Sequence, residues 1–146
     1  MPNTAAEPIQ VGALTVRFHV DTDESSGSVS VFECDVPANA RMPAPHSHDD
    51  FDETVFALNG VTTFTVGGGR TDLDPGEALF VPRRVIHGFS NGGDVDARFL
   101  AIISPGLLGS AYFREIADVL AGAGPPDVEM IGEVMRRHGL TPAPPA

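Results

Sequence analysis

Three histidines and one glutamate have the residue types and the spacing of a metal site. His46 and His48 are two residues apart, and in a β-strand this spacing places both imidazoles on one face. Glu53 follows after a short acidic turn, and His87 supplies a third imidazole near the start of a later strand. Three imidazoles and one carboxylate suit a first-row divalent cation and leave coordination positions for water, dioxygen or substrate. These residues therefore predict one metal site.

The same region contains two motifs that resemble those of the cupin superfamily. The first is formed by His46, His48, Glu53 and Gly60, and the second by Gly76, Pro82, His87 and Asn91. The resemblance implies an all-β fold with a single cupin (double-stranded β-helix, or jelly-roll) barrel. It also implies one divalent transition metal per chain, held by the three histidines and Glu53. Iron, manganese, nickel, cobalt, copper and zinc all accept this ligand set, so the metal is left open.

The resemblance has two departures, neither of which removes a proposed ligand. Ala40 stands where the first motif usually begins with glycine, and Arg84 stands where the second usually has a glycine two residues after its proline. We therefore expect the turn at Arg84 to accommodate a side chain. Arg83 and Arg84 could attract an anionic substrate, although adjacent arginines at a turn are more often exposed to solvent.

The elements that must position these residues are short strands followed by two helices. Alternating or β-branched runs separated by turn residues extend from Ile9 to about residue 101, as in an all-β barrel. Apolar residues then recur at helical spacing between Tyr112 and Leu120, and a second amphipathic stretch runs from Asp127 to His138. We expect residues 1–104 to form the barrel, with the motifs in 40–91. Residues 105–140 then form a helical extension packed on the barrel, and residues 141–146 a flexible tail.

One turn sets the expected orientation of two strands. Asn59-Gly60 between two alternating runs predicts a two-residue hairpin turn that pairs Leu58 with Val61. In that arrangement the face with Glu53 points inward, and the opposite face exposes Phe56, Leu58 and Val61. Because this outer face is apolar, we expect either the C-terminal helices or a second subunit to cover it. A homodimer, which is common among cupins, is the expected assembly.

Composition excludes several classes of function. The net charge is −11, and all nine basic residues are arginine. Without lysine there is no Schiff-base enzyme, pyridoxal-phosphate anchor or P-loop ATPase, and the acidic balance argues against nucleic acid as a partner. The first residues lack a signal-peptide profile and no apolar run is long enough to span a membrane, so we expect no membrane partner and a cytoplasmic location.

The expected function is a metal-dependent dioxygenase or related oxidoreductase that acts on a small enolic, phenolic or diketone-like compound. Glu53 is the candidate catalytic base, and Val55, Phe64 and Phe89 are the expected walls of the substrate pocket. Two alternatives remain: a metal-dependent isomerase, lyase or cyclase, and a non-catalytic barrel that binds a small molecule. Tyr112 and Phe113 are expected to be packing residues rather than a lid over a ligand.

Overall fold

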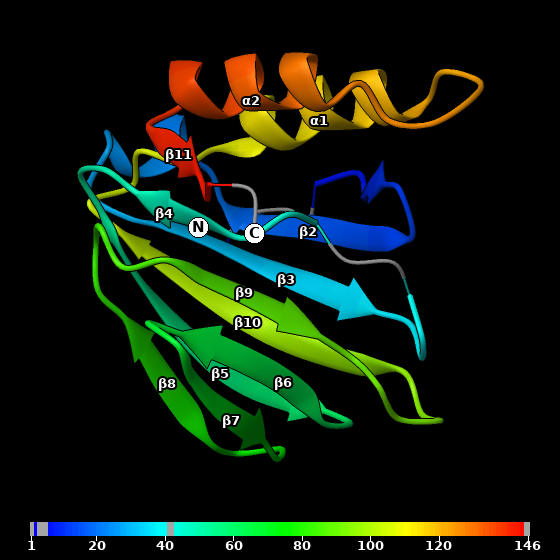
Figure 1. Cartoon of the computed structure of the whole chain (residues 1–146). Helices are drawn as coiled ribbons and strands as arrows, with labels where there is room; N and C mark the ends of the chain where they lie inside the picture. Colours follow the sequence, from blue (N-terminus) through cyan, green and yellow to red (C-terminus); the bar gives the residue numbers. More distant parts are fainter. Residues whose placement is uncertain (1, 3–5, 41–42, 145–146) are drawn as a thin grey trace.

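The computed structural model describes residues 2, 6–40 and 43–144, which form two antiparallel β-sheets and two α-helices (Figure 1). Residues 1 and 3–5 of the N-terminal segment, and 145–146 of the expected tail, lie outside the described residues. Within the described part, neither helix is long and apolar enough to cross a membrane.

The larger sheet has six strands in the order β1-β2-β3-β10-β5-β8. Their bounds are β1 Ile9–Val11, β2 Leu14–Val20, β3 Ser30–Val36, β10 Ala97–Ser104, β5 Asp52–Asn59 and β8 Ala78–Val81. A short 3₁₀ helix, η1 (Thr22–Ser25), joins β2 to β3. Along β2, β3 and β10, buried residues alternate with more exposed ones, as expected for a sheet with one face against the core.

The smaller sheet has five strands in the order β11-β4-β9-β6-β7. Their bounds are β11 Leu140–Pro142, β4 His46–His48, β9 His87–Ser90, β6 Thr62–Val66 and β7 Gly69–Leu73. The inner faces of both sheets contribute to one hydrophobic core, to which β5 supplies Val55 and β6 supplies Phe64. The predicted all-β jelly roll is confirmed, with its strands divided between two sheets.

Both predicted helices are present, and they lie together on one side of the sheets (Figure 1). Helix α1 (Ser110–Leu120) contacts β1, while α2 (Val128–Arg137) contacts β11. Asp127 caps α2 by accepting a hydrogen bond from the Met130 amide, and Gly139 follows the helix with φ of 82°. The start and stop signals in the sequence therefore predicted this helix to within a residue at each end.

The predicted pairing of Leu58 with Val61 is wrong. β5 pairs with β10 and β8, so both of its edges are occupied, and β6 pairs with β7 and β9 in the other sheet. The chain thus crosses between sheets at Gly60, whose φ is 64°, and a Cβ there would lie 2.5 Å from the Asp96 carbonyl oxygen. The inward face was nevertheless predicted correctly, because Glu53, Val55 and Phe64 are buried.

The C-terminal helices do not cover the outer face of β5. They contact β1 and β11, and Figure 1 shows them on the side of the molecule away from β8. Phe56 remains 39% exposed and Phe80, on the neighbouring strand β8, 55% exposed. Of the two covers expected for this face, only a second subunit remains a prediction.

The expected tail contains a strand that the sequence analysis missed. Leu140 is 1% exposed and pairs with His48, and Pro142 pairs with His46. The Thr141 hydroxyl also donates a hydrogen bond to the Asp49 carboxylate at 2.7 Å. The flexible-tail prediction is therefore wrong for residues 141–142, because a partner distant in sequence fixes this segment.

Candidate metal centre

Two adjacent strands bring the three histidines together. The short strand β4 carries His46 and His48, and His46 stands opposite His87 where β4 pairs with β9. The ring centroids of His46 and His87 are 4.8 Å apart, and those of His48 and His87 are 4.5 Å apart. One nitrogen from each of the three rings lies within 4.8 Å of the other two. The histidines are thus positioned to hold one metal ion.

Glu53 approaches this cluster from the opposite sheet. It lies on β5 with 9% of its surface exposed, and its Oε1 is 3.8 Å from Nε2 of His48. Neighbouring Asp52 anchors the start of the strand by accepting hydrogen bonds from the backbone and guanidinium of Arg83. Glu53 therefore contacts one histidine and lies outside the group of three whose donor atoms converge.

Backbone carbonyls orient two of the imidazole rings. Nδ1 of His87 is 3.0 Å from the Val85 carbonyl oxygen, and Nδ1 of His46 is 3.3 Å from the Ala44 carbonyl oxygen. A carbonyl only accepts, so each Nδ1 is the donor and each Nε2 keeps its lone pair for a metal. The His48 ring instead stacks on Phe51, and its buried Nδ1 has no hydrogen-bond partner among the described residues.

Burial makes the histidines neutral at physiological pH. It lowers the pKa of His46 to about 4, with a further contribution from neighbouring His87, and it also lowers the pKa values of His48 and His87. Neutral imidazole is the form that ligates metals. Burial has the opposite effect on the carboxyl of Glu53 and raises its pKa to about 7. The His48–Glu53 contact is consequently not a pair of full charges at neutral pH.

These observations fit the group that the sequence analysis predicts. Imidazole nitrogens with free lone pairs and one carboxylate are ligands of first-row divalent cations. A cation would also offset the burial of the Glu53 carboxylate, which has no cationic partner among the described residues.

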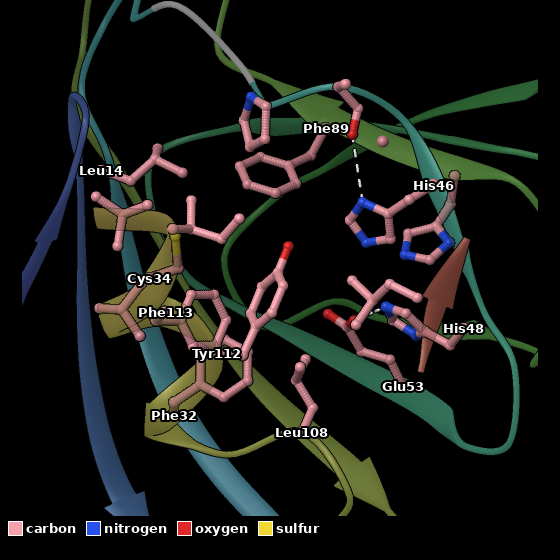
Figure 2. Close-up of a pocket in the computed structure, with 18 of the residues that line it drawn as sticks. Leu14, Phe32, Cys34, His46, His48, Glu53, Phe89, Leu108, Tyr112 and Phe113 are labelled. Carbon is pink, nitrogen blue, oxygen red and sulfur yellow. Dashed lines mark hydrogen bonds and ion pairs between the residues drawn. The ribbon is translucent and has the colours of Figure 1, made fainter. Parts of the chain in front are cut away.

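A cavity of about 90 Å³ extends from the histidines towards the inner side of α1 (Figure 2). Its walls are mostly apolar. Phe64 and Phe89 line it, whereas Val55, also expected in the pocket wall, is fully buried in the core and is not among the lining residues. Arg83 and Arg84 do not line it either. Arg83 forms a salt bridge with Asp52. Arg84 has a φ of 68°, so the turn where the cupin motif usually has glycine does accommodate a side chain here.

Sequence reasoning missed much of the apolar cavity wall. Phe113 and Tyr112 of α1 line the cavity, as do Leu14 from β2, Phe32 from β3 and Leu140 from β11. The helical spacing of Tyr112 and Phe113 reveals a buried face, but it does not distinguish a face in the core from one beside a cavity. The sequence signal that could have indicated a cavity here is a single tyrosine on an otherwise apolar helix face.

Comparison with known proteins identifies the family. A family model described as the cupin domain matches residues 32–103, a range that includes all four predicted ligands. The chain belongs to the cupin superfamily. Quercetin 2,3-dioxygenase of Bacillus subtilis (strain 168) is 26% identical to this chain over 98 residues. That match covers 67% of this chain but only 28% of the dioxygenase.

Solved cupin structures share the fold. The polyketide cyclase RemF from Streptomyces resistomycificus superposes with a TM-score of 0.57 and 27% identity, over 69% of this chain and 72% of that one. A Bacillus subtilis oxalate decarboxylase gives a TM-score of 0.61 at 23% identity, over 69% of this chain and 28% of the decarboxylase. The chain thus spans under a third of the dioxygenase and of the decarboxylase, and most of the cyclase.

Proposed function

We propose that this cupin is a metal-dependent dioxygenase or related oxidoreductase for a small enolic, phenolic or diketone-like compound. The observation that carries the proposal is the convergence of three neutral imidazoles at one end of an apolar cavity, with a single carboxylate beside them. The similarity to a quercetin dioxygenase supports the same reaction class.

His46, His48, His87 and Glu53 would hold one divalent transition metal, which supplies Lewis acidity for an ionised substrate oxygen and a place for dioxygen. The metal can be any of Fe, Mn, Ni, Co, Cu or Zn. Glu53 has a second role as the base. Its carboxyl lies at the cavity wall, where it can accept a proton from a substrate bound there. Phe64 and Phe89 would exclude water and favour a flat, apolar ligand.

The size of the cavity sharpens the expected substrate. Drug-sized ligands occupy pockets of about 300–1,000 Å³. A cavity of about 90 Å³ is better matched to a catechol or a short 1,3-diketone than to a flavonol.

Oxygen consumption tests the proposal directly. Apoprotein loaded separately with Fe(II), Mn(II), Ni(II) or Co(II) is mixed with catechols, 1,3-diketones and flavonols in an oxygen electrode. At least one metal form should consume oxygen with a small substrate, and His87→Ala should abolish the uptake. No uptake in any combination would reject the dioxygenase.

Glu53→Gln separates the two roles of the carboxyl. If Glu53 is the base, the nearly isosteric amide should retain measurable metal binding and lose about 10²–10⁴-fold in rate. Equal losses of metal affinity and rate would make Glu53 a ligand only.

A metal-dependent cyclase is the second candidate. The similarity to RemF extends over comparable shares of both chains, whereas the match to the dioxygenase covers a small part of that protein. Ring closure by condensation needs the Lewis acid without oxygen. Anaerobic Zn(II)-loaded protein incubated with a linear 1,3-polyketone should then yield a product lighter by one water, as read by mass spectrometry. Failure of both reactions, with ligand binding retained, would favour a non-catalytic binding protein.

We also propose that the chain forms a homodimer through the apolar outer face of β5 and β8. Phe56 and Phe80 lie there and are exposed in one chain. Light scattering at micromolar concentration should give twice the chain mass, and Phe80→Ser should lower it. A monomer mass for the wild type would reject this assembly.

A further inference from the structure

Tyr112 places a hydroxyl in the cavity. It is the only tyrosine in the chain and is 6% exposed. Figure 2 shows its hydroxyl directed away from α1, towards the space between Phe89 and the histidines. Within the described residues its hydroxyl forms no hydrogen bond. The hydroxyl oxygen is not among the fully enclosed polar atoms of the described residues, so it faces the cavity with its donor free for a ligand.

The ring is held in place by its neighbours. It makes edge contacts with Phe113, at a centroid distance of 5.0 Å, and with His138 of the α2 terminus, at 5.5 Å. The first turn of α1 is itself anchored, because the backbone amide and hydroxyl of Ser110 both donate hydrogen bonds to Asp21. The direction of the Tyr112 hydroxyl is thus preorganised, which reduces the entropic cost of a hydrogen bond to a ligand.

We propose that Tyr112 is a ligand-binding residue whose hydroxyl donates a hydrogen bond to an oxygen of the molecule in the cavity. This inference rests on the proposed function, because it takes the cavity as the binding site of the substrate. The ligand then carries two oxygens, one directed to the histidine end and one to Tyr112, on a small apolar frame. Burial raises the pKa of Tyr112, so the hydroxyl remains a donor at neutral pH.

The chain offers a direct optical probe. It has no tryptophan, so its intrinsic fluorescence comes from Tyr112 alone. Zn(II)-loaded protein, which has no redox chemistry, is titrated with 4-nitrocatechol and with 4-nitrophenol, which differ by one hydroxyl. Both probes absorb near the emission of tyrosine, so binding in the cavity should quench the fluorescence of the wild type.

Tyr112→Phe removes only the hydroxyl. Affinity for 4-nitrocatechol, followed by its own absorbance, should fall about three- to tenfold, the range expected for one hydrogen bond. Affinity for 4-nitrophenol and for Zn(II) should stay unchanged. The variant without ligand should be at least as stable to urea as the wild type, because the lost hydroxyl has no partner in the described protein.

The matched control is Leu14→Ala, which alters the wall contributed by β2 without a polar atom and leaves the ring contacts of Tyr112 in place. It should change the affinities for both probes by the same factor. Equal binding of 4-nitrocatechol by wild type and Tyr112→Phe would overturn the role of Tyr112 while leaving the proposed function intact. If neither probe binds the Zn(II)-loaded wild type, the cavity is not a site for such ligands, and both proposals fail.

Discussion

The two ends of the cavity are built in different ways. At the polar end, His46, His48 and His87 lie on two strands of one sheet, and the pairing of β4 with β9 places their rings together. At the apolar end, the walls come from β1, β2, β3 and α1, and β1 and α1 are about a hundred residues apart in sequence. The chemistry thus depends on one pair of strands, and the shape of the cavity depends on packing among several elements. Substitutions at the two ends should therefore affect different measurements.

The largest expected effect is on metal affinity at the polar end. His48→Ala removes one of three convergent nitrogens and should weaken Zn(II) binding by at least about a hundredfold, since even supporting groups contribute tenfold to a hundredfold. Isothermal titration calorimetry measures the change. His19→Ala, outside the cluster, is the control histidine and should bind Zn(II) as the wild type does.

Ile116→Ala tests the other end in the same assay. Ile116 lies on α1, is 7% exposed and lines the cavity. Its truncation should cost about 2–5 kcal/mol in the free energy of urea unfolding and leave Zn(II) affinity unchanged. A large loss of Zn(II) affinity in this variant would show that the two ends are not separable.

The same division explains what the sequence could predict. His46 and His48 were recognisable because residues two apart share one face of a strand, and Glu53 and His87 were added by the resemblance to the cupin motifs. The inward face of β5 followed from the alternation of side chains along the strand, and Phe64 was placed on the same face by the turn at Asn59-Gly60. The pairing of Leu58 with Val61 failed, because β10 and β8, which are distant in sequence, occupy both edges of β5. Turn residues specify a bend, but they do not specify which strand will pair.

Strand β11 was missed for a related reason. Three residues show no periodicity, and their partner β4 lies about ninety residues earlier, so only the folded chain reveals the pairing. Tyr112 was assigned to packing because helical spacing reports a buried face without saying what it faces. In both cases the structure depends on contacts between residues that are far apart in the sequence.

Leu140 connects the two ends and should give an intermediate effect. It pairs with His48 across β11 and β4, and its side chain lines the cavity. Leu140→Ala should cost about 2–5 kcal/mol in unfolding free energy and also weaken Zn(II) binding by about tenfold, because β4 loses support beside a ligand. Urea unfolding and calorimetry measure the two quantities.

The matched control is Leu73→Ala, in the same sheet. Leu73 is 2% exposed and does not line the cavity. It should lose comparable stability and keep its Zn(II) affinity. If Leu140→Ala also keeps full affinity, β11 stabilises the fold without supporting the site.

The smallest expected effect is the pH dependence of stability in metal-free protein, and its sign differs between the residues of the polar end. Burial lowers the pKa of His46 from 6.5 to about 4 and acts in the same direction on His48 and His87. Below pH 6.5 the unfolded chain binds protons that the folded site resists, so these residues contribute stability that is lost as the pH falls towards 4. Glu53 acts oppositely. Its pKa is raised from 4.5 to about 7, so its contribution to stability is present below pH 4.5 and is lost as the pH rises through 7.

Three histidines outweigh one carboxyl, so the melting temperature in the presence of EDTA should fall as the pH is lowered from 6.5 to 4. His48→Gln should flatten that fall, and Glu53→Gln should steepen it by removing the opposing contribution. Identical pH profiles for the wild type and His48→Gln would contradict the buried, neutral state of this histidine.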